Sequence, residues 1–359
     1  MRSALPSIRT VAKKAGVSTT TVSRVLNNSP IPSEETRRKV MKVIEKLDYR
    51  PDPVLSQATR NRMTAMARGE HPAVALKSLG LSVGRQIILR AQKNDGYYSR
   101  LLGGVHQVAH QREYRIITEP ALTDQLPRMV MENLVGGILV DAHLPETLLR
   151  SLARRLPVVT IDKQYDLPGI SAVMPDVAGG VAEIMEELWG LGHRRMLPFL
   201  VTTHPQPHDS HYLQAFKGFY AGKNEALPFA KMIRLREISP KTNEAVLSNW
   251  LDEVLACSPR PTALLMRDVY ALTVIAMLKK RGLAVPRDIT VVGMDNMGLA
   301  TTIHPPLSTY GFPMDEMARL ATEHLVRRME DATVLPAILK VSGQLFRQGT
   351  SGRAPVNAN

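Results

Sequence analysis

The stretch IRTVAKKAGVSTTTVSRVLN, residues 8–27, decides the fold of the amino-terminal part of the chain. Apolar residues recur at helical spacing in its first half and predict a helix with one buried face. These residues are Ile8, Val11, Ala12 and Ala15. Gly16 ends this helix, and Ser18 is placed to cap a second helix with its own apolar face. Two short helices joined by a turn that contains glycine form a helix-turn-helix, whose second helix is shaped for the major groove of DNA.

The polar face of this unit carries the side chains that we expect to contact DNA. Small hydroxyl groups near the start of the second helix allow a close approach to base edges and phosphates. Arg24 adds a guanidinium that can donate two hydrogen bonds to one base. The expected contact residues are Ser7, Thr10, Ser18, Thr19, Thr20, Thr21, Ser23, Arg24 and Asn27. An ordinary helical hairpin with a solvated polar face would show the same pattern. The net charge of the surrounding sequence is needed to distinguish it from a DNA-binding unit.

The surrounding sequence is strongly basic. Residues 1–62 carry thirteen Lys and Arg against five Asp and Glu, a net charge of +8. The whole chain of 359 residues has a net charge of +13, so more than half of the excess lies in about a sixth of its length. Concentrated positive charge is typical of a module that binds nucleic acid, which favours the DNA-binding interpretation.

The run VAKKAGVSTTTVSRVLN, residues 11–27, followed by PSEETRRKVMKVIEKLDYRPD, residues 32–52, resembles the headpiece of LacI/GalR-type bacterial transcriptional regulators. Ser33 is placed to cap a third helix, and the prolines after Tyr49 end it. The resemblance implies a three-helix headpiece within residues 1–51. It also implies that Thr19 and Thr20 choose the DNA operator and that Arg24 reads a base.

Residues 52–84 depart from the family pattern, in which a short hinge helix follows the headpiece directly. Two segments are candidates for this helix, residues 54–58 and residues 72–79. We favour the second, PAVALKSL, because its pattern is closer to the usual hinge; it implies an insertion before the hinge. In this interpretation an apolar side chain wedges into the minor groove and kinks the DNA. The hinge residues would be Ala75, Lys77 and the wedge Leu79. A basic linker without a hinge helix is the remaining alternative.

From residue 85 onward, short apolar runs alternate with helical patterns. We predict strands at 86–91, 115–119, 135–140, 157–161, 171–174, 196–201, 262–266 and 289–294. We predict helices at 98–112, 145–155, 177–191, 211–223, 242–256 and 268–282. The alternation indicates the α/β class, with two doubly wound subdomains of parallel sheet wrapped by helices. Such folds bind ligands at the carboxyl ends of the strands.

Short motifs in this region also resemble the LacI/GalR family. They are LGHRR at 191–195, PTA at 261–263, VPRDITVVGMD at 285–295 and PPLST at 305–309. The resemblance implies a core like that of periplasmic sugar-binding proteins, in which the chain crosses between the subdomains three times. The implied division is 85–192 with 311–329 for the first subdomain, 193–310 with 330–350 for the second, and a flexible tail at 351–359.

The resemblance also implies an effector cleft between the subdomains. Its residues, transferred position by position, are Tyr97, Tyr98, Asp176, Ala215, Arg267, Asp268, Asp295 and Phe312. Ala215 and Arg267 depart from the family, which has Arg and Asn there, so sugar binding is less favoured. Arg267 could pair with an anionic effector, because guanidinium binds carboxylate and phosphate bidentately. It could equally bond Asp268 or Asp295 and serve only the structure, or the core could bind nothing and act only in dimerisation.

The remaining patterns exclude other classes of protein. No nucleophile elbow or phosphate-binding loop is present, so we expect no enzyme, no catalytic residue and no cofactor. We expect no metal site either, because the three histidines of HPQPHDSH, residues 204–211, lie in a loop with two prolines. A solute-binding protein is the competing class, but the N-terminus has no apolar signal segment and the chain has one cysteine, Cys257. We therefore expect a homodimeric regulator in the bacterial cytoplasm, on the nucleoid, that binds double-stranded operator DNA and a small-molecule effector such as a sugar or sugar acid.

Overall fold

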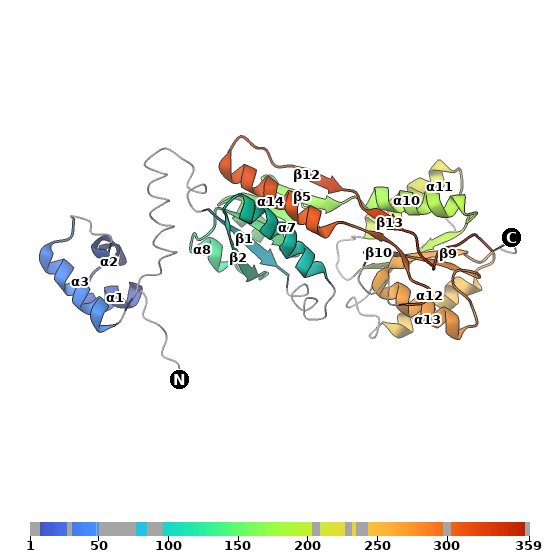
Figure 1. The fold of residues 1–359 in the computed structure, drawn as a ribbon, viewed down its shortest axis with the longest axis horizontal. Helices are drawn as coiled ribbons and strands as arrows, with labels where there is room; N and C mark the ends of the chain where they lie inside the picture. Colours follow the sequence, from blue (N-terminus) through green and yellow to red (C-terminus); the bar gives the residue numbers. More distant parts are fainter. Residues whose placement is uncertain are drawn as a thin grey trace. The chain divides into compact units, whose positions relative to one another are not determined.

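The computed structural model describes residues 8–26, 31–47, 49, 77–84, 96–202, 209–226, 232–234, 243–296 and 303–355. The chain divides into two compact units, residues 1–76 and residues 77–359, and each is described by itself. In the described part of the chain, no helix is both long enough and apolar enough to cross a membrane. Figure 1 shows the elements of each unit.

The first unit is a three-helix domain with its own small core. Its helices are α1 (Ile8–Ala15), α2 (Thr19–Leu26) and α3 (Glu34–Lys46). Gly16 adopts a positive φ of 64° in the turn between α1 and α2, a conformation that glycine reaches without strain. The Ser33 hydroxyl accepts a hydrogen bond from the Thr36 amide at the start of α3, which confirms the predicted cap. The core consists of Val11, Ala12, Ala15, Val22, Val25 and Val40.

The second unit begins with a parallel sheet of six strands in the order β12-β5-β4-β3-β1-β2. The strands are β1 (Ser78–Val83), β2 (Arg115–Pro120), β3 (Gly137–Asp141), β4 (Val158–Ile161), β5 (Ile170–Pro175) and β12 (Ile338–Val341). Helices α7 (Tyr97–Gln111) and α14 (Met314–Glu330) cover one face, and α8 (Arg128–Met131) and α9 (Glu146–Ala153) cover the other. Alternate residues of each strand enter these two cores, as in Leu139 toward α14 and Ile138 toward α9.

A second sheet has five strands in the order β13-β11-β10-β9-β6, and only β13 runs antiparallel to its neighbour. The strands are β6 (Met196–Pro198), β9 (Ala263–Arg267), β10 (Thr290–Met294), β11 (Ser308–Gly311) and β13 (Gln344–Phe346). Strands β7 (Leu200–Thr202) and β8 (Met232–Arg234) pair separately. Helices α10 (Val177–Gly190) and α11 (Asp209–Gly222) pack on one face, and α12 (Glu244–Ala256) and α13 (Asp268–Lys280) on the other. The predicted strands and helices from residue 98 to 294 are confirmed within a few residues.

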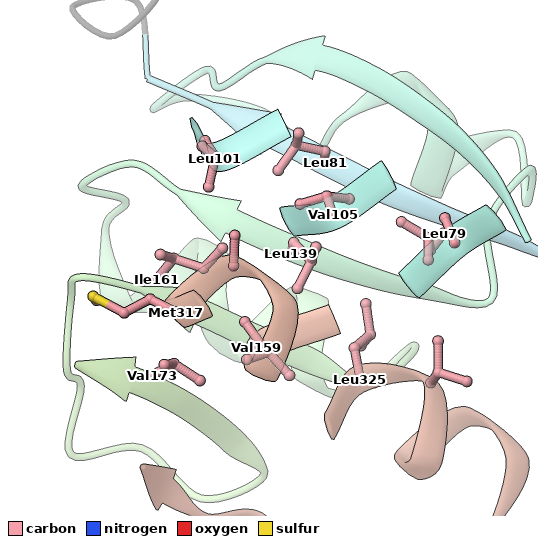
Figure 2. Packing of buried hydrophobic residues seen from close by; sticks show 14 of the residues in the cluster. Leu79, Leu81, Leu101, Val105, Leu139, Val159, Ile161, Val173, Met317 and Leu325 are labelled. Carbon is pink, nitrogen blue, oxygen red and sulfur yellow. The ribbon is translucent and has the colours of Figure 1, made fainter. Parts of the chain in front are cut away.

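The predicted hinge at 72–79 is wrong at its carboxyl end. Leu79 lies in β1, pairs with Ile116 of β2 and is 0% exposed, so it cannot act as a wedge in DNA. Figure 2 shows Leu79 with Leu81 and Leu139 in the core beneath α7. The sequence contains a signal against the hinge. Leu79, Leu81 and Val83 alternate along the chain and point into one core, which is the pattern of a strand. Lys77 precedes the strand and donates to the Arg112 carbonyl, while Ala75, residues 54–58 and the predicted strand 86–91 lie outside the described residues.

The subdomain boundaries also differ from the prediction. Helix α10 packs on α11 and on the second sheet, so the first crossing comes directly after β5 and not after residue 192. β12 lies at the edge of the first sheet, whereas the resemblance predicts residues 330–350 in the second half. The chain therefore crosses after β5, between β11 and α14, and between β12 and β13. The chain crosses between the subdomains at the end of a strand. The sequence pattern shows where each strand and helix lies, but it does not show which sheet a helix packs on, so the crossings were predicted at the wrong positions.

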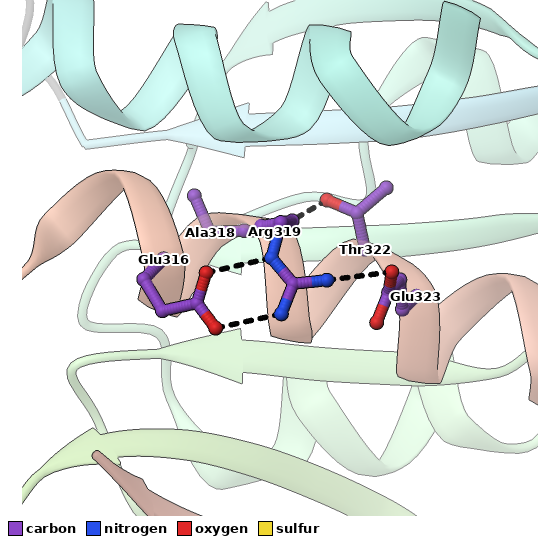
Figure 3. Close-up of polar contacts among 5 residues, drawn as sticks. All are labelled: Glu316, Ala318, Arg319, Thr322 and Glu323. Atoms are coloured by element: carbon purple, nitrogen blue, oxygen red, sulfur yellow. Dashed lines mark hydrogen bonds and ion pairs between the residues drawn. The ribbon is translucent and has the colours of Figure 1, made fainter. Parts of the chain in front are cut away.

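Helices α7 and α14 approach each other closely. A Cβ added to Gly104 of α7 would lie within 2.1 Å of the Asp315 carbonyl and 2.8 Å of Ala318 Cβ, so only glycine fits there. Next to this contact, Arg319 donates to both carboxylate oxygens of Glu316, each at 2.6 Å, and to Glu323 at 2.7 Å (Figure 3). These charge-assisted bonds within one helix hold the Arg319 side chain in a fixed orientation.

The predicted flexible tail at 351–359 is wrong for residues 351–355. The Thr350 hydroxyl donates to the Val291 carbonyl at 2.7 Å and accepts from the Ser308 amide at 2.8 Å. Further along, the Ala354 amide donates to the Leu191 carbonyl, and His193 bonds the Gly352 carbonyl. Small polar residues look like a tail in the sequence, but here their backbone groups are hydrogen-bonded to the segment that follows α10 and to Thr290 of β10.

Candidate nucleic-acid interface and effector site

The helix-turn-helix presents one polar face. The Ser18 hydroxyl accepts from the Thr21 amide at 3.1 Å, which caps α2 and fixes its start. Thr19, Thr20 and Arg24 are exposed on α2, opposite the buried Val22 and Val25. Thr10, Thr21 and Ser23 are partly buried, while Ser7 and Asn27 lie outside the described residues. The exposed set is hydroxyls followed by a guanidinium, the donors and acceptors that can contact bases and phosphates.

The first sheet of the second unit has a point where the strand order reverses, and the second sheet has its strands side by side in chain order. In the first sheet, β2 pairs on one side of β1 and β3 on the other. In the second sheet, β9 lies between β6 and β10. Ligands of open α/β sheets bind at the carboxyl ends of the strands near such points. Asp141 ends β3 and Arg267 ends β9, so a charged residue lies at each of these strand ends.

Asp141 forms a buried ion pair. Its Oδ1 accepts from Lys163 Nζ at 3.0 Å, and the two side chains are 0% and 11% exposed. Burial raises the pKa of Asp141, an effect that Lys163 partly offsets, with a smaller contribution from Tyr97. Burial alone would lower the pKa of Lys163, but the charges of Asp141 and Asp162 more than compensate and raise it. Each member of the pair therefore favours the charged form of the other, in opposition to the effect of burial.

Arg267 forms a second ion pair that is more open to solvent. Its Nε donates to Asp295 Oδ2 at 2.9 Å, and the side chains are 29% and 22% exposed. Asp295 raises the pKa of Arg267, and Tyr212 and Asp162 add smaller contributions in the same direction. Asp162 follows β4 of the first sheet, whereas Arg267 ends β9 of the second sheet. The contribution of Asp162 to the pKa of Arg267 is therefore made between the two sheets. Asp141, Asp162, Lys163, Arg267 and Asp295 together define the strand-end site.

The other predicted effector residues have structural contacts. Asp268 is 1% exposed and accepts from the Thr309 hydroxyl at 2.7 Å, so it ties β11 to α13 and cannot touch a ligand, contrary to the prediction. Asp176 caps α10 by accepting from the Gly179 amide. Phe312 packs against both halves and contacts Tyr310 edge to face. Tyr97 and Tyr98 begin α7 beside the first core, and Ala215 of α11 borders the second.

Sequence reasoning missed Asp141, Asp162 and Lys163. A usable signal was present, since each follows or ends a strand that the sequence predicted, at 135–140 or 157–161. Asp162 also has a positive φ of 58°, and Asp295 one of 128°, conformations that non-glycine residues rarely adopt. Among the described residues, no group of three or more His, Cys, Asp or Glu side chains has the arrangement of a metal site. The histidines at 204 and 208 lie outside that part.

The comparisons with known proteins cover both units. Residues 7–52 match the bacterial regulatory proteins of the lacI family, and residues 185–351 match a periplasmic binding protein-like domain. The transcriptional repressor PurR of Aliivibrio salmonicida is 28% identical over 91% of this chain and 93% of its own. PurR of Photobacterium profundum is 27% identical with the same coverage.

Solved structures agree on the fold. A complex of the transcriptional regulator CelR with cellobiose is 21% identical, covers 96% of this chain and all of that one, and has a TM-score of 0.63. The lac repressor dimer bound to operator and an anti-inducer is 20% identical, covers 97% and all of that chain, and has a TM-score of 0.62. A helix-turn-helix unit joined to a two-sheet periplasmic-binding-protein-like core defines a class of DNA-binding regulators, which are not enzymes. This chain is similar to the LacI/GalR family of transcriptional regulators, through its lacI-family domain and its PurR relatives.

Proposed function

We propose that the chain is a transcriptional repressor that reads its operator with α2 and is controlled by a small molecule bound at the strand-end site. The observation that carries the first part is the exposed face of Thr19, Thr20 and Arg24 on a capped helix whose other face is buried. The lacI-family match over residues 7–52 supports the same assignment. Thr19 and Thr20 then select the bases, and Arg24 donates to a base edge. A homodimer reads two half-sites, and binding places the protein on the nucleoid.

The second part rests on charged residues at the carboxyl ends of strands in two sheets. A ligand that touches both Asp162 and the Arg267–Asp295 pair connects the two halves of the core. It changes operator affinity only by the difference between its affinities for the DNA-bound and DNA-free states. The family match of residues 185–351 and the name of the PurR relatives are consistent with such control.

Selection of operator sequences from a random duplex pool by the full chain tests the first part. Arg24→Ala should weaken binding to the selected sequence by about 1–3 kcal/mol and relax the preference at one base position, while the affinity for unrelated DNA changes little. Lys46→Ala, at the end of α3, is the matched control that removes one exposed positive charge outside α2. Failure to enrich any sequence, or equal effects of the two variants, would disprove the assignment of α2.

A further inference from the structure

The second sheet has a strongly basic edge, where its parallel strands begin. Four segments make up this basic edge: residues 190–195 before β6, 257–262 before β9, 279–288 before β10 and 351–355 after β13. They carry eight Lys and Arg against one Asp, a net charge of +7. The other residues from 63 to 359 carry 25 Lys and Arg against 27 Asp and Glu. The positive charge that follows the headpiece is therefore concentrated at one edge of one sheet.

Hydrogen bonds join the segments that precede β6 and β9. The Arg195 carbonyl accepts from the Thr262 amide at 2.9 Å, and Arg195 Nε donates to the Arg260 carbonyl at 3.0 Å. The Arg194 guanidinium stacks on the Trp189 ring at 4.1 Å, and its Nη1 donates to the Trp189 carbonyl at 2.8 Å. Nε and Nη2 of the exposed Arg194 form no hydrogen bond within the described residues, so they can donate to an anion.

The carboxyl-terminal segment presents a cation between two anchored residues. The Gly352 carbonyl bonds His193 at 2.9 Å, and the Ala354 amide donates to the Leu191 carbonyl at 2.9 Å. The Gly352 amide also donates to β10, which follows residues 279–288. Arg353 lies between these anchors with an exposed side chain. Its backbone is therefore held in place while its guanidinium faces solvent.

Few of the cations at the basic edge have a carboxylate partner. Asp288 is the one acidic residue of the four segments, and it is paired with Arg287 at 3.0 Å. Arg281 is paired with Asp252 of α12 at 2.8 Å. In the part of the chain that the structure describes, four exposed cations of the basic edge have neither a side-chain hydrogen bond nor an ion pair. They are Arg260, Lys279, Lys280 and Arg353.

The ends of the helices account for only part of this charge. Lys279 and Lys280 lie in the last turn of α13, where a positive charge stabilises the helix itself. Arg260 and Arg353 lie outside the helices, so they have no such role. Exposed arginines at these two positions therefore point to a partner outside the chain.

The composition of the basic edge favours a nucleic acid over a protein as this partner. Protein interfaces have an apolar centre, rich in aromatic side chains, inside a polar rim. None of the large hydrophobic side chains that are exposed among the described residues lies in the four segments. Contact with phosphates requires only positive charge and hydrogen-bond donors, and guanidinium pairs with phosphate bidentately.

We propose that the basic edge binds the phosphate backbone of double-stranded DNA without reading its sequence. Arg194, Arg260 and Arg353 supply guanidinium groups, and Lys279 with Lys280 adds charge beside them. The chain then has a DNA contact in its second unit in addition to that of α2 in the first. This inference goes beyond the proposed function and requires no effector.

The salt dependence of binding to a short duplex of unrelated sequence tests the contact. The full chain is compared with the double variant Arg260→Gln with Arg353→Gln, which loses two charges that have no partner in the fold. Each neutralised phosphate contributes about 0.9 to the slope of log K against log salt concentration, so this slope should fall by about 2. The melting temperature should not change, because neither side chain bonds another described residue.

The matched control is Arg154→Gln with Arg155→Gln. These two arginines are also exposed, and they follow α9 on the first sheet. The control has the same net charge as the test variant and should keep the slope of the wild type. An unchanged slope in the test variant, or an equal fall in both variants, would overturn the inference.

A second measurement separates the basic edge from α2. The wild-type chain is saturated with its selected operator, and capture of a labelled duplex of unrelated sequence by that complex is followed on a native gel. The wild type and the control should capture the second duplex, and the variant of Arg260 and Arg353 should capture less of it. Equal capture by all three proteins would assign the second contact to another surface.

Polyglutamate distinguishes DNA from an acidic protein as the partner. Unlabelled unrelated duplex should displace the captured duplex at a lower concentration of charge than polyglutamate does. Displacement by polyglutamate at the same or a lower concentration would contradict the assignment to DNA and favour an acidic protein segment. Selection of the operator itself is measured independently, so a failure of this inference leaves the function of α2 standing.

Discussion

The two halves of the core hold their strand-end charges in different ways. Asp141 and Lys163 in the first half are almost fully buried, whereas Arg267 and Asp295 in the second half are about a quarter exposed. A buried pair depends on its partner, because an isolated charge in the interior is very unfavourable. A partly exposed pair has water as an alternative partner and can rearrange at a small cost. The first pair is thus a fixed part of the fold, and the second is suited to respond to a ligand.

Breaking the buried pair should have the largest effect. Asp141→Ala leaves Lys163 buried without its counter-ion, so the free energy of unfolding should fall by about 3–5 kcal/mol. Urea denaturation followed by circular dichroism measures this change.

The matched control removes both charges. The double variant Asp141→Leu with Lys163→Met should recover most of the lost stability, because no uncompensated charge remains. A single variant as stable as the double one would show that water reaches Lys163 and that the two pairs do not differ as described.

The packing of the first half can be tested with two adjacent glycines of α7. Gly104→Ala places a methyl group against the Asp315 carbonyl and should destabilise the protein by about 1–3 kcal/mol. Gly103→Ala meets nothing within 4 Å and should stabilise the helix by up to about 1 kcal/mol. Thermal unfolding of both variants measures the difference, and equal effects would mean that α7 and α14 are not in close contact.

The partly exposed pair, Arg267 with Asp295, should matter little for stability. Arg267→Ala with Asp295→Ala, analysed as a double-mutant cycle in urea, should give a coupling energy of about 1 kcal/mol or less. A coupling as large as that of the buried pair would contradict the distinction between the two halves.

The smallest effect should be a pH dependence in the second half. Burial lowers the pKa of His193, which bonds Thr262 and the Gly352 carbonyl. On acidification, His193 therefore binds a proton in the unfolded chain at a higher pH than in the folded chain. Its contribution to the free energy of unfolding is complete above a pH of about 6.5 and decreases as the pH falls below that value. The unfolding free energy of His193→Gln should lose less on acidification than that of the wild type. A parallel loss in both proteins would place the sensitivity elsewhere, for example at the buried His324.

The sequence predicted most of the elements and the face of α2, because periodicity and capping are local properties. It failed where a residue's role depends on distant partners. Leu79 looked like a hinge residue because its partners, Ile116 and Leu139, lie far along the chain. The sequence left two roles open for Arg267, pairing with an anionic effector or bonding Asp268 or Asp295. The observed contact with Asp295 fits the second role. Asp162 was missed because its importance comes from a charge on the other sheet.

The position of β12 and β13 has a consequence for how the protein is made. β12 completes the edge of the first sheet, β13 that of the second, and Thr350 fastens the last described segment to β10. Both halves of the core therefore need the last strands of the chain to be synthesised before they are complete, while the headpiece has all its core residues by Tyr49. A message cut short after the first third of the gene would still encode the DNA-reading helix, without the body that is proposed to control it.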